Sequence, residues 1–357
     1  MKRISIVMCV VGVCIAFAAQ VQTQQPHTIV KFNVRGAGNS AGQGTLGEGI
    51  VDGGSIVGVY VDSTNVYHGF LRSPNGHITK INIPGSQNTF PEGMNSALAI
   101  VGYYGDSGGV YHGFLRSPGG KLSVLDAPGA GTAAGQGTIV GDINTKGEIA
   151  GNYIDSNNVY HSFLRTVAGK FTKVDAPGAG TGSGQGTLTA GFSGLTDAGA
   201  TAGDYIDANN TSHGFLRLPS GKFASPIDPT GSIGTFVIGV SLNKTVAGIY
   251  YDSTGAFHGF VRRASDGTIT GFDVPNSAGT GANNIDPAGT IAGPYYDSIG
   301  AMHGYVRAPG GHFTTFNVPG AGTGGGQGTS ANSSNSAGTI TGNYVDSNGV
   351  NHGYVRQ

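Results

Sequence analysis

Seven copies of one short pattern run through this sequence and constrain its fold more than any other feature. The pattern is G-x-Y-x-D-x5-H-G-[FY]-[LV]-R, with Ser162 replacing its second glycine in the third copy, and its histidines recur every 44 to 52 residues. Every copy holds an aspartate six positions before the histidine and an arginine four positions after it. The triplets are Asp62, His68, Arg72; Asp106, His112, Arg116; Asp155, His161, Arg165; Asp207, His213, Arg217; Asp252, His258, Arg262; Asp297, His303, Arg307; and Asp346, His352, Arg356. A period of this length is typical of solenoids, propellers and other repeat architectures.

Alternation of apolar and polar residues divides each repeat into four short strands. In the third repeat we expect strands at residues 137–144, 151–155, 161–165 and 169–177, with an Asp-Ser-Asn-Asn turn between the second and the third. Four short strands in roughly 47 residues are the signature of a β-propeller blade. Glycine makes up 66 of 357 residues and tryptophan is absent, which also favours a turn-rich all-β protein. We therefore predict a seven-bladed β-propeller.

The connections between strands indicate where one blade ends and the next begins. Three connections per repeat are hairpin-short, whereas the link after the outermost strand is long and glycine-rich, as in residues 128–138. With the boundary there, the chain starts on the outermost strand of a blade (27–34) and ends on a third strand (351–356). We expect the N-terminal strand to complete the last blade and close the ring. An open β-solenoid is the alternative.

The N-terminus has the composition of a signal peptide. Two cations are followed by an apolar run from Ile4 to Phe17 and a small-x-small site at residues 16–18. We predict a signal peptide at 1–18, a linker at 19–26, a single repeat domain at 27–357 and a secreted, periplasmic or extracellular location. Both cysteines lie in the predicted leader, and no later segment is long and apolar enough to span a membrane.

Charge excludes several classes of partner. Without the leader, 17 cationic and 20 acidic side chains remain, and no basic cluster is present to hold nucleic acid or an anionic membrane. We predict no cofactor. The nearest calcium-loop pattern is incomplete in every copy, so a bound calcium ion stays an alternative without support from the sequence. We expect a monomer.

The segment "GDSGG" at residues 105–109 matches the surroundings of the nucleophile in chymotrypsin-like proteases. The same position reads "VDSTN", "IDSNN" and "VDSNG" in other copies, so Ser107 belongs to a repeated hairpin turn. A serine protease also needs a histidine and an aspartate in their own contexts. We assign Ser107 no catalytic role.

The Asp, His and Arg triplets are interpreted as a structural lattice, because a single active site needs only one copy. In this interpretation aspartate can orient the imidazole and pair with arginine between blades, and the hairpin register decides which of these residues pair. A metal pair or an acid and base pair is the alternative.

Four of the glycine-rich links contain G-Q-G-T, with Gln43, Gln136, Gln185 and Gln327. A phosphate-binding loop would need a following helix, so the first interpretation of these links is a glycine-dependent turn. In the blade order above, the links and the Asp-Ser hairpins share one face of the ring, which suits hydroxyl-rich ligands such as glycans.

With the repeat defined, residues 27–357 resemble the extracellular HAF-repeat proteins of bacteria, "HGF" standing where that family has His-Ala-Phe. The downstream signature of that family is replaced here by "DAPGAGT", so a neighbouring repeat family fits as well. The resemblance implies an exported repeat protein and transfers no catalytic residue. We predict a non-enzymatic binding or surface-interaction module for glycans or protein partners. A polysaccharide lyase or hydrolase on the same scaffold is the alternative.

Overall fold

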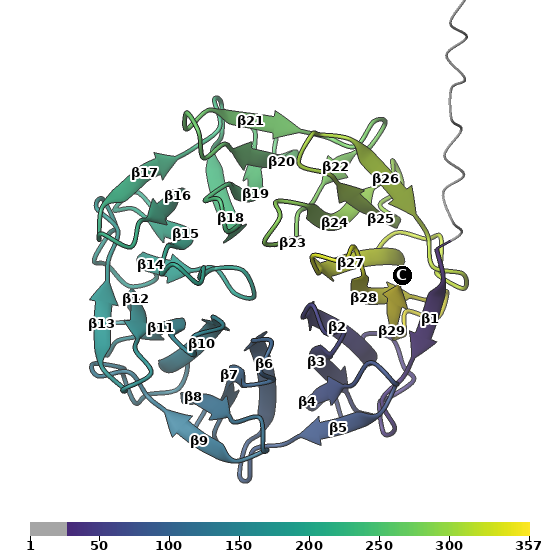
Figure 1. The fold of residues 1–357 in the computed structure, drawn as a ribbon, viewed down its shortest axis with the longest axis horizontal. Coiled ribbons are helices and arrows are strands. Elements are labelled where there is room, and N and C mark those ends of the chain that lie inside the picture. Colours follow the sequence, from purple (N-terminus) through teal and green to yellow (C-terminus); the bar gives the residue numbers. More distant parts are fainter. Residues whose placement is uncertain (1–26) are drawn as a thin grey trace, which may run out of the picture.

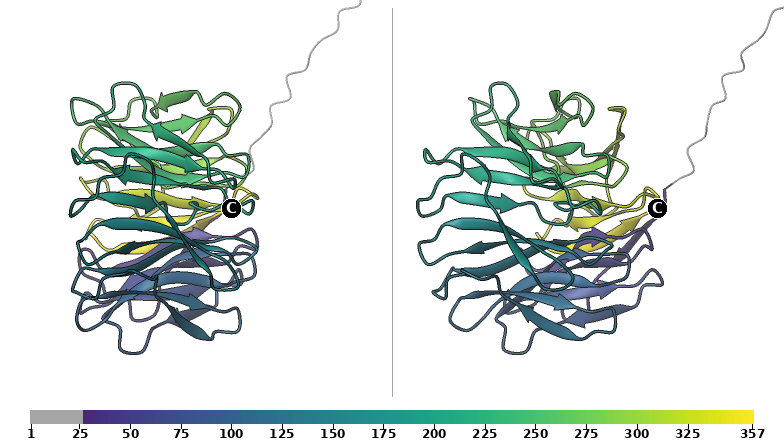
Figure 2. Two further views of the ribbon diagram at one scale, coloured as in Figure 1. Left: turned by 90° about the vertical axis from the view of Figure 1, so that its left-hand side faces the viewer. Right: turned by 60° about the vertical axis from the view of Figure 1, so that its left-hand side comes forward.

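The computed structural model describes residues 27–357, so the predicted signal peptide and linker lie outside the described residues. Within 27–357 the regular structure consists of strands, and none of it is a helix that could cross a membrane. The strands form sheets that radiate from a central axis (Figure 1), and the ring is flattened along that axis (Figure 2). The predicted all-β propeller is confirmed.

Strand pairing gives seven antiparallel four-stranded units, here called blades 1 to 7 and ordered from the innermost strand outward. Blades 1 to 3 comprise β2 (Gly44–Ile50), β3 (Ile56–Val61), β4 (Tyr67–Arg72) and β5 (Ile78–Ile81); β6 (Asn88–Met94), β7 (Ile100–Gly105), β8 (Tyr111–Arg116) and β9 (Leu122–Leu125); and β10 (Gly137–Ile143), β11 (Ile149–Ile154), β12 (Tyr160–Arg165) and β13 (Phe171–Val174). Blades 4 and 5 comprise β14 (Gly186–Thr189), β15 (Thr201–Ile206), β16 (Ser212–Arg217) and β17 (Phe223–Ile227); and β18 (Gly234–Val240), β19 (Val246–Tyr251), β20 (Phe257–Arg262) and β21 (Ile269–Phe272). Blades 6 and 7 comprise β22 (Gly279–Thr280) with β23 (Asn284–Ile285), β24 (Ile291–Tyr296), β25 (Met302–Arg307) and β26 (Phe313–Phe316); and β27 (Gly328–Ser334), β28 (Ile340–Val345), β29 (Asn351–Arg356) and β1 (Ile29–Phe32).

The ring closes between the two ends of the described chain. Strand β1 pairs antiparallel with β29, which places Phe32 opposite Gly353. Val34, next to β1, packs with Ile56 and Phe70 of blade 1. The N-terminal strand therefore completes blade 7, and the fold is a closed ring rather than an open solenoid.

The hydrophobic core lies between neighbouring blades. The first glycine of the repeat leaves space for a large side chain in this core. In blade 3, Gly151 lies opposite Phe163, and a Cβ at Gly151 would come within 2.8 Å of the Phe163 ring. The phenyl ring thus occupies the space that a side chain at Gly151 would need. Val101 of blade 2 packs into the same cluster as Phe163 and Ile149.

The two faces of the ring carry different connections. The hairpin face carries the Asp-Ser hairpins and the crossings from each blade to the next. The turn face carries the turn after each innermost strand. On the turn face the Asn95 side chain donates to the Asn144 carbonyl, and Asn144 in turn donates to the Thr196 carbonyl. Asn335 donates to the Val51 carbonyl across the closure.

Each innermost strand carries a β-bulge next to the channel. The unpaired bulge residues in six blades are Glu48, Glu92, Gly141, Ile238, Asn283 and Asn332. In blade 4 pairing is interrupted over residues 191–193, because Ala190 and then Gly194 both bond to Ala202 and the bridge of Leu195 to Thr201 follows. A three-residue insertion in the fourth repeat has therefore enlarged the bulge into a loop, and bulges of this kind redirect side chains at functional sites.

Candidate functional site

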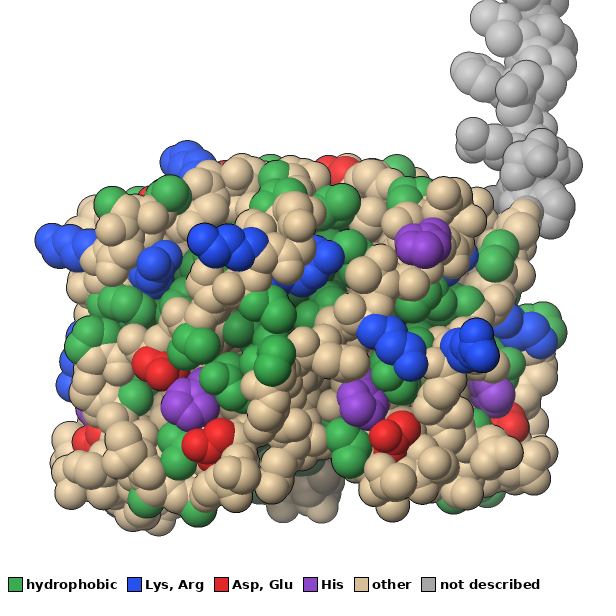
Figure 3. All heavy atoms as spheres, turned by 90° about the horizontal axis from the view of Figure 1, so that it is seen from below, with side chains coloured by type: hydrophobic (Ala, Val, Ile, Leu, Met, Phe, Trp, Pro, Cys, Tyr) green, Lys and Arg blue, Asp and Glu red, His purple; other side chains and the backbone are tan. Residues whose placement is uncertain are grey.

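Each repeat places a tyrosine, a histidine and an aspartate together near the hairpin face. In blade 1, Tyr60 lies opposite His68, and the two rings stack with centroids 4.8 Å apart. The His68 Nε2 lies 2.9 Å from the Asp62 carboxylate, and Nδ1 lies 3.2 Å from the Asn82 side chain. Figure 3 shows such histidines beside acidic side chains near one rim of the ring.

The partner of the second imidazole nitrogen varies between blades. Blades 2 to 5 use an aspartate there, whereas blades 1, 6 and 7 use an asparagine. Partial burial alone would lower the pKa of His112, but its hydrogen bonds to Asp126 and Asp106 raise that pKa overall. In every repeat the imidazole Nδ1 has a hydrogen-bond partner within the chain, and Nε2 lies 2.9 to 3.5 Å from the repeat aspartate. The proposed role of the triplets as a lattice remains a prediction.

The expected pairing of aspartate with arginine is wrong. No salt bridge joins a repeat arginine to a repeat aspartate in residues 27–357. Histidine and arginine are four residues apart on an extended strand, a separation of roughly 13 Å. Arg72 instead stacks on Phe32 of blade 7, and Arg307 stacks on Phe272 of blade 5, so these two arginines bind neighbouring blades through cation–π contacts.

The four repeat glutamines brace loops rather than face solvent. The Gln136 Oε1 accepts from the Ala133 N–H at 3.1 Å, and its Nε2 donates to Asn158 at 3.0 Å. Gln43, Gln185 and Gln327 make equivalent bonds within their crossings and to the hairpins. These contacts place the crossings and the hairpins on the same face, whereas ligand binding by the glutamines stays a prediction.

The crossings fall into two lengths, and only the long ones cover a hairpin. Crossings of 11 residues follow blades 2, 3, 6 and 7, and each donates one backbone hydrogen bond to the hairpin of the blade it leaves, as Gly135 does to Gly109. Crossings of six residues follow blades 1, 4 and 5, and no such bond reaches the hairpins of these blades within the described chain. The hairpin face is therefore uncovered at three junctions.

Two rows of aromatic rings occupy uncovered junctions. The first row runs from Tyr67 of blade 1 to Phe90, Tyr103 and Tyr111 of blade 2, with successive centroids 5.1, 4.9 and 5.7 Å apart. The second row runs from Phe236, Tyr251 and Phe257 of blade 5 to Tyr296 of blade 6, at 6.0, 6.1 and 5.3 Å.

The rows present both ring surface and hydroxyl groups to solvent. Tyr67, Phe236 and Tyr251 are 37%, 40% and 36% exposed, whereas the phenylalanines of the third strands, such as Phe70 and Phe163, are fully buried. Burial raises the pKa of Tyr103, with Glu92 adding to the effect, so its hydroxyl keeps its proton at neutral pH. Asp62 and Asp252 are bonded to His68 and His258, whose side chains lie on the sheet face opposite to Tyr67 and Phe257.

A second feature lies on the axis of the ring. Two of the bulge residues are glutamates, and they come from adjacent blades. Burial raises the pKa of Glu48 to about 7, and burial together with Glu48 raises the pKa of Glu92 to about 8. Asn332, another bulge residue, donates to the Gly47 carbonyl at 3.0 Å and lies 3.5 Å from Glu48.

The enlarged bulge of blade 4 extends into the channel and narrows it, as Figure 1 shows for the loop after β14. The Phe192 ring lies against Gly49 of blade 1, where a Cβ would come within 2.4 Å of the ring. Ser193 accepts a hydrogen bond from the Asn284 side chain of blade 6 at 2.7 Å and bonds through its carbonyl to Val240 of blade 5. Asp142 of blade 3 accepts from the Leu195 N–H. The loop is thus fixed to blades on several sides of the channel.

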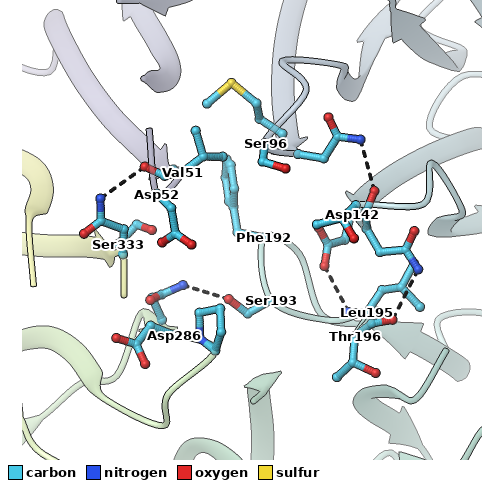
Figure 4. A pocket seen from close by; sticks show the side chains of 18 of the residues that line it. Val51, Asp52, Ser96, Asp142, Phe192, Ser193, Leu195, Thr196, Asp286 and Ser333 are labelled. Carbon is cyan, nitrogen blue, oxygen red and sulfur yellow. Dashed lines mark hydrogen bonds between the residues drawn. The ribbon is translucent and has the colours of Figure 1, made fainter. Parts of the chain in front are cut away.

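A pocket of about 180 Å³ opens on the turn face around this loop (Figure 4). Sequence reasoning missed the pocket, the glutamate pair and the aromatic rows, because all three arise from differences between repeats. The signal for the loop was the 52-residue spacing from His161 to His213, the longest in the chain.

Comparisons with known proteins identify the fold and no family. No family model matches the chain, and no curated protein matches its sequence. A lectin of Burkholderia pseudomallei, BP39L, is similar in structure, with a TM-score of 0.55, 12% identity and coverage of 89% of this chain and 94% of the lectin. A puromycin hydrolase variant has a TM-score of 0.55 and 13% identity over 86% of this chain, which spans about half of the hydrolase. At these identities the likeness shows a β-propeller, and the resemblance to HAF repeats stays a prediction.

Proposed function

We propose that this protein is an exported, non-enzymatic carbohydrate-binding module that holds glycans on its hairpin face. The observation that carries the proposal is the pair of half-exposed aromatic rows at junctions without a long crossing. Export rests on the leader predicted at residues 1–18. The similarity to a propeller lectin supports the proposal at the level of the fold.

The chemistry of the rows matches a neutral sugar better than other flat or apolar ligands. A pyranose has a face of C–H groups that packs on an aromatic ring and an edge of hydroxyls that bond to polar groups. The hydroxyls of the row tyrosines supply polar groups beside the rings. Nucleic acid bases also stack on aromatic rings, but a polyanion needs cations to pair with its phosphates, and the two rows consist of aromatic side chains without a cation among them.

The alternative of a polysaccharide hydrolase would use the Glu48 and Glu92 pair, because two carboxyls with separate pKa values are the usual requirement. Neither side chain lines the pocket at the turn face. Glu92 lies close enough to Tyr103 of the first row to act on its pKa, but the blades of the second row carry Ile238 and Asn283 at the bulge instead of glutamates. Binding therefore accounts for more of the geometry than hydrolysis does.

Substitution of single row residues tests the proposal. Affinity electrophoresis and calorimetry against neutral glucans, mannans, galactans and xylans should identify a bound polysaccharide. Tyr67→Ala and Phe236→Ala should each weaken that binding by about tenfold, since a stacked ring contributes about 0.5–1.5 kcal/mol beyond its buried area.

Tyr160→Ala provides the matched control. Tyr160 begins the third strand of blade 3 as Tyr67 begins that of blade 1, but its backbone N–H is capped by Gln185 of a long crossing. Binding should be unchanged in this variant. An equal loss in Tyr160→Ala, or no binding to any polysaccharide tested, would refute the proposal.

A further inference from the structure

The two aromatic rows lie far from each other around the ring. The first row belongs to blades 1 and 2, and the second row belongs to blades 5 and 6. Blades 3 and 4 stand between them on one side of the channel, and blade 7 stands between them on the other. In Figure 1 the blades of the first row lie below the central channel and those of the second row lie above it. The rows are therefore two patches on opposite sides of the channel.

Both rows nevertheless open on the same face of the molecule. Tyr67 is the first residue of β4 and directly follows an Asp-Ser hairpin, whereas Tyr251 is the last residue of β19 and directly precedes one. Phe236 is the third residue of β18, an innermost strand that begins where the crossing from blade 4 ends. Each of these rings thus stands at the hairpin end of its strand. A long polymer laid across the hairpin face can contact both rows.

Each row is complete without the other. Within residues 27–357 the rings of a row contact rings of the same row and none of the other row. Each row also has its own exposed rings, Tyr67 in the first and Phe236 with Tyr251 in the second. The two rows are not copies of one pattern, because blade 2 has Gly105 where blade 5 has Tyr251. Loss of one row therefore leaves the other row intact.

Two separate stacking sites on one face suit a polymer that repeats the same sugar. A single aromatic stacking contact is a weak interaction, so one row alone gives low affinity for a neutral sugar. When the second row binds the same polymer, that step is intramolecular, and the overall affinity exceeds that of either row without any new type of contact. A short oligosaccharide supplies its sugar at one row, whereas a polysaccharide supplies the same sugar at both.

We propose that the protein is bivalent for glycans, with one site at each row and both sites occupied at the same time by a neutral polysaccharide. The partner is therefore a repeating polymer rather than a single oligosaccharide. This inference rests on the proposed function, because it assigns the number and the position of the sites to the glycan binding described there.

Cross-linking of soluble polysaccharides by the purified full chain tests the number of sites. The probes are soluble glucan, mannan, galactan and xylan, and light scattering reports when one protein joins two polymer chains. With the polysaccharide that it binds, the unaltered chain should raise the scattering at intermediate protein concentrations. Excess protein should reverse the rise, because each polymer chain then carries its own proteins. Tyr67→Ala and Phe236→Ala should each still bind that polysaccharide in affinity electrophoresis, about tenfold more weakly, but should no longer cross-link it.

Tyr160→Ala is the matched control here too, and it should cross-link the polysaccharide as the unaltered chain does. Each single-row variant keeps the other row, so its remaining binding also shows that it is folded. Binding without cross-linking by the unaltered chain, cross-linking that survives in either single-row variant, or loss of all binding in one of them would overturn bivalency and leave the proposed function standing. Absence of binding to every polysaccharide would overturn both.

Discussion

At the scale of single residues, the bulges decide which side chains face the channel and what charge they carry there. Glu48 and Glu92 occupy the same position in their repeats, and the bulge directs both toward the axis of the ring. A carboxyl in this position loses most of its contact with bulk water, and this loss of solvation disfavours its charged form. The pair therefore imposes a pH dependence on the stability of the whole ring.

Glu92→Gln should remove part of that dependence. The folded-state pKa of Glu92 is about 8, above its ordinary value of 4.5, so between these pH values the unfolded chain is ionised while the folded chain holds its proton. The free energy of unfolding must then fall as pH rises across this range. Urea unfolding should show Glu92→Gln to be about 1–2 kcal/mol more stable than the unaltered chain at pH 8, and nearly equal to it at pH 5. An equal gain at both pH values would show that charge is not the cause.

At the scale of elements, the repeat glycines allow adjacent strands and rings to approach closely. In blade 1 a Cβ at Gly58 would lie 2.1 Å from the Leu46 carbonyl oxygen and 3.0 Å from the Phe70 ring. Gly53 in the preceding turn has no atom within 4 Å of an added Cβ, and its φ is not in the left-handed region. Neither glycine needs a left-handed backbone, so the space around an added Cβ decides the effect of a methyl group at each position.

Gly58→Ala should therefore lower the free energy of unfolding by about 2 kcal/mol or more, because the added methyl forces β2 and β3 apart. Gly53→Ala should leave stability unchanged or slightly raised, since it reduces the freedom of the unfolded chain without a clash. Thermal and denaturant unfolding of the two variants measure the difference. Equal stabilities would contradict the packing argument.

Sequence patterns predicted the elements well where all repeats agree, and failed where repeats differ. The G-x-Y and H-G-F segments predicted the strands, the hairpins and the closing role of residues 27–34. They did so because every blade needs the same residue types at the same positions in order to pack. Phe236 and the Phe192 loop break the pattern, so a search for shared features passes over them. Tyr67 has the same residue type as Tyr111 and Tyr160, and only the short crossing beside it sets it apart. The Asp and Arg pairing failed for another reason. The Asp and the Arg of each repeat both lie on predicted strands, but they lie at opposite ends of the hairpin, so the length of the strands keeps them apart.

At the scale of the whole molecule, stability depends on whether the ring stays closed at blade 7. The closing strand β1 is short, and Phe32 at its end lies against Gly353, stacks edge to face with Phe70 at 5.9 Å and supports the Arg72 guanidinium at 4.9 Å. Phe272 occupies the equivalent position in blade 5 and contacts Tyr305 and Arg307 of blade 6. The two phenylalanines make similar contacts, but only Phe32 holds the two ends of the chain together.

Phe32→Ala and Phe272→Ala should each lower the free energy of unfolding by about 2–4 kcal/mol. The loss is smaller than for a fully buried phenylalanine, because both rings are half-buried. Their effects on local opening should differ. Hydrogen exchange should accelerate in β1, β29 and β2 of Phe32→Ala well before global unfolding, because loss of the ring frees a chain end and exposes sheet edges. In Phe272→Ala the chain continues through the junction on both sides, so exchange should rise only through global unfolding. Equal patterns of exchange in the two variants would mean that the ring is held by all its junctions alike, with no special weakness where the chain ends meet.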